Sequence, residues 1–78
     1  MKMKRGKTYY YEEVEGYAKH YGYGITEHGK KIVGGNVIIL TKDIGREVVI
    51  IFVLNRITSN GNFYECVFTN EPIGVIDS

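Results

Sequence analysis

Residues 47–54 read EVVIIFVL, and every position from 48 to 54 is apolar. A strand with one face in water alternates apolar and polar residues, whereas a strand buried on both faces is apolar throughout. Alternation divides this run into two faces: the even-numbered positions form one, and Val49, Ile51 and Val53 form the other. The sequence therefore predicts a strand with two apolar faces in a chain of 78 residues, which has room for one core.

The residues that follow predict a hairpin. Asn60-Gly61 is a pair that tolerates the positive φ angles of a type I′ turn, so it is expected to join a long strand at 47–57 to a partner at 62–69. In that partner strand Phe63 and Val67 share one face with Glu65.

The segment TYYYEEVEGYAKHYGYG predicts an amphipathic helix from about Tyr9 to His20 or Tyr21, with Thr8 as its N-cap. Apolar side chains recur at spacings of three and four, which places them on one face of the helix. Gly22 supplies the C-terminal stop. The positions on the buried face are 10, 14, 17, 18 and 21.

Short strands separated by turn residues follow this helix, at about 23–27, 31–33 and 37–41, with turns at 28–31, 34–36 and 42–45. The predicted fold is α+β: one N-terminal helix packed on an antiparallel meander of four to five strands. We expect a flexible basic arm at 1–7, a single domain at 8–70 and a short tail at 71–78.

A single helix cannot cover both faces of the long hairpin. Either the sheet curls around its own core, or the second face meets another protein, which could be a second copy of this chain. The second reading makes four residues candidates for partner binding, namely Val49, Ile51, Val53 and Phe63.

Six of the seven tyrosines fall between positions 9 and 23, and tyrosine is enriched at binding hot spots. Those at helical spacing fit the core, so Tyr9 and Tyr11 are the better candidates for a binding surface. Glu12 and Glu15 lie on an acidic helix edge that a basic partner could contact, although such an edge is ordinarily a solvated face.

Four of the ten basic residues lie in the first seven positions, which leaves six basic against nine acidic residues in the rest of the chain. The basic side chains beside the tyrosines suggest an alternative function, in which phosphates take the charge and Tyr9 and Tyr11 stack on bases. The arm is otherwise expected to be a solubilising tail. Its basic residues are Lys2, Lys4, Arg5 and Lys7.

No catalytic, cofactor or metal motif is found. One cysteine and two histidines make a poor zinc set, and Cys66 falls on an apolar strand face. The longest apolar run, seven residues, is far shorter than the roughly 20 that span a bilayer, and no signal-peptide pattern follows the basic start. We therefore expect a cytoplasmic protein without a cofactor and without a metal.

The leading prediction is a small non-enzymatic protein-interaction module. Its size and its richness in Lys, Tyr, Ile and Asn are typical of phage or mobile-element proteins that inhibit a host defence protein by covering one of its surfaces. The alternatives are a small nucleic-acid-binding protein and, least favoured, a small ribonuclease that uses His28.

Overall fold

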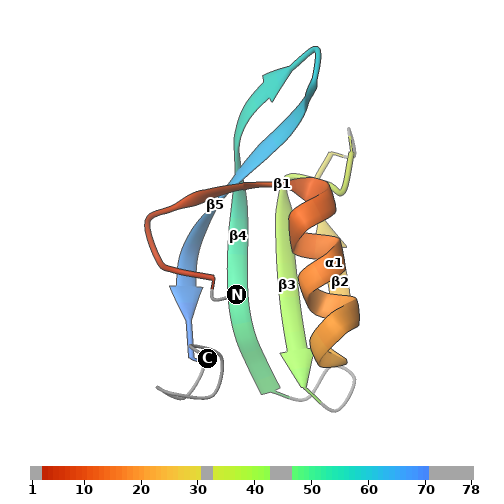
Figure 1. Cartoon of the computed structure of the whole chain (residues 1–78), viewed down its shortest axis with the longest axis vertical. Helices are drawn as coiled ribbons and strands as arrows, with labels where there is room; N and C mark the ends of the chain where they lie inside the picture. Colours follow the sequence, from red (N-terminus) through yellow and green to blue (C-terminus); the bar gives the residue numbers. More distant parts are fainter. Residues whose placement is uncertain (1–2, 31–32, 43–46, 71–78) are drawn as a thin grey trace.

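The chain forms one helix and one antiparallel sheet, in a computed structural model that describes residues 3–30, 33–42 and 47–70. The elements are β1 (Thr8–Tyr10), α1 (Tyr11–Tyr21), β2 (Gly24–His28), β3 (Val37–Lys42), β4 (Glu47–Thr58) and β5 (Gly61–Thr69). The five strands lie in the order β1-β5-β4-β3-β2, and each neighbouring pair is antiparallel. The predicted α+β fold is confirmed, with a short strand added before the helix (Figure 1).

The helix begins two residues later than predicted. Residues 8–10 pair with β5, so Tyr10, in an extended conformation, takes the N-cap position that was expected for Thr8. The backbone N–H of Tyr10 donates to Oε1 of Glu13 at 2.9 Å, which satisfies a donor next to the helix start. The predicted stop is confirmed, because Gly22 has a left-handed φ of 76° and the next N–H donates to the carbonyl of Ala18 at 2.8 Å.

The hairpin turn is confirmed but lies one residue earlier than predicted. Thr58 pairs with Gly61, so the connecting residues are Ser59 and Asn60. The Thr58 hydroxyl donates to the Gly61 carbonyl at 2.7 Å and accepts the Asn60 N–H at 3.2 Å. The Thr58 side chain therefore bridges the two ends of the turn by hydrogen bonds.

Some predicted boundaries lie outside the described residues, namely those at 31–32, 43–45 and 71–78. Val33 is described and does not belong to a strand. The turn that follows it is confirmed, since Gly34 and Gly35 both have positive φ angles.

Three β-bulges shape the sheet. An extra residue stands in β4 against β3 at Val49, in β4 against β5 at Asn55, and in β5 against β4 at Val67. A bulge bends the strand and increases its right-handed twist. The β4–β5 hairpin accordingly bends and extends past the level of β1 (Figure 1).

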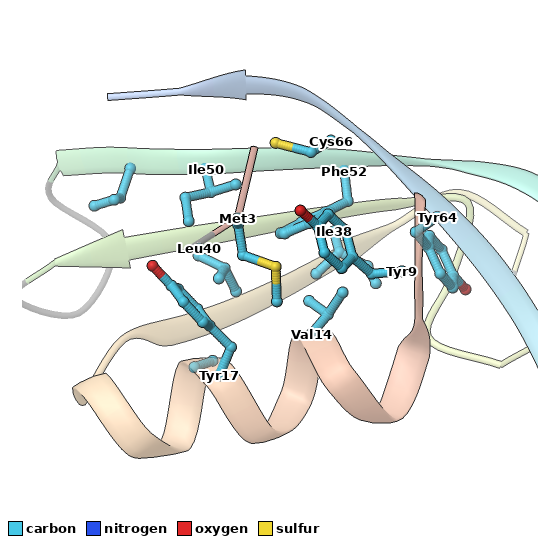
Figure 2. Packing of buried hydrophobic residues seen from close by; sticks show 12 residues of the cluster. Met3, Tyr9, Val14, Tyr17, Ile38, Leu40, Ile50, Phe52, Tyr64 and Cys66 are labelled. Carbon is cyan, nitrogen blue, oxygen red and sulfur yellow. The ribbon is translucent and has the colours of Figure 1, made fainter. Parts of the chain in front are cut away.

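One face of the sheet, called here the inner face, is covered by α1 and by the N-terminal segment 3–7. The helix lies over β2 and β3, while the N-terminal segment lies over β4 and β5 (Figure 1). Met3 is fully buried and points into the space between the sheet and the helix (Figure 2). The buried apolar core consists of Met3, Tyr9, Val14, Tyr17, Ala18, Ile38, Leu40, Val49, Ile50, Phe52, Tyr64 and Cys66.

The described part of the predicted flexible arm is therefore fastened to the domain. The Gly6 N–H donates to the Cys66 carbonyl at 2.7 Å, and the Cys66 N–H donates to the Lys7 carbonyl at 2.9 Å. The Lys4 N–H donates to the hydroxyl of Tyr9 at 2.8 Å. These hydrogen bonds hold the N-terminal segment against the rest of the domain, with Met3 in the core.

Candidate functional site

The face of the sheet opposite α1, called here the outer face, is the candidate functional site. Side chains alternate along strands, so the register of each strand pair assigns residues to this face. Three rows cross it: Phe68, Ile51 and Ile39; Thr8, Glu65, Val53 and Val37; and Tyr10, Phe63 and Arg56.

The centre of the outer face is apolar and accessible. Val53 is 38% exposed and Phe68 is 39% exposed, while Ile39 and Ile51 are half-buried. The bulge at Val67 turns that side chain to the same side as Phe68, so both stand out of the sheet. Neither α1 nor the N-terminal segment covers these residues, because both lie on the inner face (Figure 1).

An aromatic and cationic cluster borders the apolar centre, at the level where the hairpin leaves the sheet. The rings of Tyr10 and Phe63 lie 4.4 Å apart between centroids, and the guanidinium carbon of Arg56 lies 5.0 Å from the Phe63 centroid. Glu65 adds a carboxylate that accepts a hydrogen bond from Asn55 at 3.4 Å. The outer face therefore carries a cation, Arg56, and an anion, Glu65.

The structure brings three of the predicted partner-binding residues together on this face, namely Ile51, Val53 and Phe63. The prediction for the fourth sheet residue, Val49, is wrong, because Val49 lies on the inner face. It is 2% exposed, because the bulge at this position turns Val49 and Ile50 to the same, inner side.

Tyr9, a predicted candidate for the binding surface, is buried instead. Tyr9 belongs to β1 rather than to the helix, points to the inner face and is 9% exposed. Its ring meets Phe52 edge-on, with centroids 6.2 Å apart. Tyr10, which was expected in the core, takes the exposed position on the outer face instead.

Tyr11 is the first residue of α1 and is engaged within the domain. Its hydroxyl donates to Oε2 of Glu27 at 2.6 Å, and this hydrogen bond is the main reason why the pKa of Tyr11 is raised above its usual 10.0, with burial and nearby carboxylates adding to it. The neighbouring Tyr64 hydroxyl lies against the carbonyls of Val33 and Gly35. Burial raises the pKa of Tyr64 as well. The Tyr11 hydrogen bond thus ties the start of α1 to β2, and the Tyr64 hydroxyl ties the loop at 33–35 to β5.

The other predicted residues lie away from the outer face. Glu12 is exposed and Glu15 is half-buried on α1, so they belong to the helix side of the molecule. Lys4, Arg5 and Lys7 are exposed, and Lys2 lies outside the described residues. With Tyr9 buried and Tyr11 bonded to Glu27, the basic segment lacks the two stacking rings that the nucleic-acid alternative assigned to it.

Sequence reasoning missed Tyr10 and Arg56 as members of the site. Both become neighbours of Phe63 only through strand pairing, so no local pattern could have grouped them.

Among the described residues, no three His, Cys, Asp or Glu side chains gather in a way that could hold a metal ion. Cys66 is buried, with its thiol 3.6 Å from the Phe68 carbonyl. Within the part of the chain that the structure describes, the helix is too short to cross a membrane.

Comparison of this chain with models of protein families, with curated proteins and with solved structures gave no match. The function is therefore inferred from the residues and their geometry.

Proposed function

We propose that this protein is a small, non-enzymatic, cytoplasmic protein-interaction module that pairs with a second copy of itself through the outer face of its sheet. The observation that carries the proposal is the accessible apolar surface around Ile51, Val53 and Phe68. An apolar sheet face left in water costs free energy, and packing two such faces about 10 Å apart removes it from water.

The rim of the face is compatible with a two-fold arrangement. In a symmetric dimer each residue of the patch meets the same patch of the partner copy, so a cation and an anion on one rim can pair across the axis. Arg56 and Glu65 are such a couple. Tyr10 and Phe63 supply aromatic anchors of the kind that dominate binding energy.

The first experiment is the absolute mass by light scattering after size exclusion, over a dilution series. We expect twice the chain mass at high concentration and a shift toward the single chain on dilution. Val53→Glu places a charge in the centre of the proposed interface and should give a monomer at every concentration. Ile57→Glu is the matched control, because Ile57 is on the same strand, is 53% exposed and lies outside the three rows.

A monomeric wild-type protein at the highest concentration would contradict self-association. Self-association through the outer face would also be contradicted if Val53→Glu and Ile57→Glu lowered the mass equally. The effect of the added charge would then not depend on its position in the proposed interface. The finer prediction, that the protein inhibits a host defence protein, stays a prediction that a binding partner would have to establish.

A further inference from the structure

The side of α1 that points away from the sheet is called here the helix face. Its residues are all exposed, and four of them lie three or four positions to either side of a central glycine, which places the set on one side of the helix. The outer face of the sheet lies on the opposite side of the molecule, so a contact made here does not compete with the proposed dimer. The helix face consists of Glu12, Glu13, Gly16, Lys19 and His20.

Gly16 is the centre of the helix face. A Cβ atom at this position would meet nothing within 4 Å, and Gly16 does not belong to the glycines with positive φ. Neither packing inside the domain nor backbone conformation therefore requires glycine here, although glycine weakens the interior of a helix relative to alanine. A pocket of about 290 Å³ adjoins it. What the glycine provides is access to the helix backbone from outside the domain.

This access suits a second helix. Packed helices have their axes about 8–10 Å apart, and each Cα atom lies about 2.3 Å from its axis, so facing Cα atoms are roughly 3.5–5.5 Å apart. Two backbones come this close most readily where small residues meet. Gly16 is the one position of the helix face without a side chain, so the closest approach of a second helix is expected there.

The charges of the helix face change sign at its centre, because the first turn of α1 is acidic and the last turn is basic. Glu13 already accepts a backbone N–H at 2.9 Å, and the His20 ring packs edge-on against the ring of Tyr21 at 4.6 Å. Glu12 and Lys19 are the exposed charges that a partner can engage. They are seven positions apart, about 10 Å along the helix axis.

We propose that the helix face binds the helix face of a second copy, with the two α1 helices antiparallel and a two-fold axis beside Gly16. Such an axis relates positions at equal distances before and after its centre, so Glu12 of each copy comes opposite Lys19 of the other, and the ion pair forms twice. A parallel arrangement would place Glu12 against Glu12 and Lys19 against Lys19. The charge pattern therefore selects the antiparallel one.

This contact is weak and depends on salt. The helix has 11 residues and is about 16 Å long, so the pairing buries much less surface than the roughly 1,200 Å² of a stable interface. Exposed ion pairs contribute little and are screened by salt. The pairing is therefore expected at high protein concentration and low ionic strength, where it adds a second copy on the side of the sheet that the proposed dimer leaves open.

Disulfide trapping under mild oxidation tests whether the two Gly16 positions meet. A disulfide joins Cα atoms about 4.4–6.8 Å apart, so Gly16→Cys should link two chains. The trapping is done in the Val53→Glu variant, so that the result does not depend on the outer-face dimer. Ile57→Cys, at a position that is 53% exposed on the hairpin, is the matched control for random collision, and the buried Cys66 gives the background. We expect Gly16→Cys to cross-link about tenfold faster than Ile57→Cys; equal rates would overturn the proposal.

Charge variants of the Gly16→Cys chain test the antiparallel arrangement. Lys19→Glu places a carboxylate opposite Glu12 of the other copy, and it should slow cross-linking about fivefold at low salt. Adding Glu12→Lys to that chain restores opposite charges across the axis and should restore the rate. Circular dichroism checks that each variant keeps its helix. A rate that Lys19→Glu leaves unchanged, or a double variant as slow as the single one, would overturn antiparallel pairing.

Discussion

Replacement of Gly34 by alanine tests the close contact between the loop at 33–35 and the Tyr11 ring at the start of α1. Gly34 has φ +73°, and a Cβ there would lie nearer than 3.0 Å to two ring carbons of Tyr11. The left-handed conformation itself costs an alanine about 1–2 kcal/mol. The Tyr11 ring must also move away, which breaks its hydrogen bond to Glu27, a bond to a charged group worth about 1.5–3 kcal/mol.

Gly34→Ala should thus lower the free energy of unfolding by about 2.5–5 kcal/mol, a large part of the roughly 4–12 kcal/mol expected for a chain of this size. Gly22 is the matched control. Its φ of +76° is nearly the same, but a Cβ there meets nothing within 4 Å, so Gly22→Ala should cost about 1–2 kcal/mol.

Urea unfolding followed by far-UV circular dichroism measures both variants. The same substitution is then repeated in a Tyr11→Ala background, where the obstructing ring is absent. The cost of Gly34→Ala should fall there to that of Gly22→Ala. If Gly34→Ala costs no more than Gly22→Ala, or costs the same with and without the Tyr11 ring, the contact between the loop and the helix start does not stabilise the fold as described.

Two further predictions concern ionisation and the N-terminal segment. The pKa of Tyr11 is raised above 10.0 in the folded state, so its stabilising effect is fully present below pH 10 and is lost as the pH rises through the folded-state pKa. Urea titrations on either side of pH 10 should show the free energy of unfolding falling with pH, and Tyr11→Phe should reduce that slope; an unchanged slope would contradict this assignment. Met3→Ala should lower the free energy of unfolding by about 2–4 kcal/mol because Met3 is fully buried, whereas joint replacement of Lys4, Arg5 and Lys7 by glutamine should leave stability nearly unchanged. If Met3→Ala were as stable as the wild type, the N-terminal segment would be a free arm rather than part of the core. If the wild-type protein shifted DNA in a gel at low salt and the glutamine variant did not, the nucleic-acid alternative would be supported.

Much of the candidate site follows from the sequence. The unbroken apolar run predicted a strand with two apolar faces, and Ile51, Val53 and Phe63 do share one face of the sheet, as alternation predicted. The sequence could not assign Val49 to the core, because the bulge that turns it inward is a property of the pairing between β3 and β4. One extra residue in a strand reverses the facing of the side chains beyond it.

By itself the sequence determined the features that a few neighbouring residues encode: the helix that buries Val14 and Ala18, its end at Gly22, and the hairpin after β4. Helical periodicity, the freedom of glycine at positive φ and the preferences of turn residues all act within a few positions of the chain. Only the tertiary structure decided that residues 8–10 form a strand and that Met3 enters the core. The partner of those residues is β5, more than fifty positions away, and the free edge that β5 offers outweighs the local preference for one more helical turn.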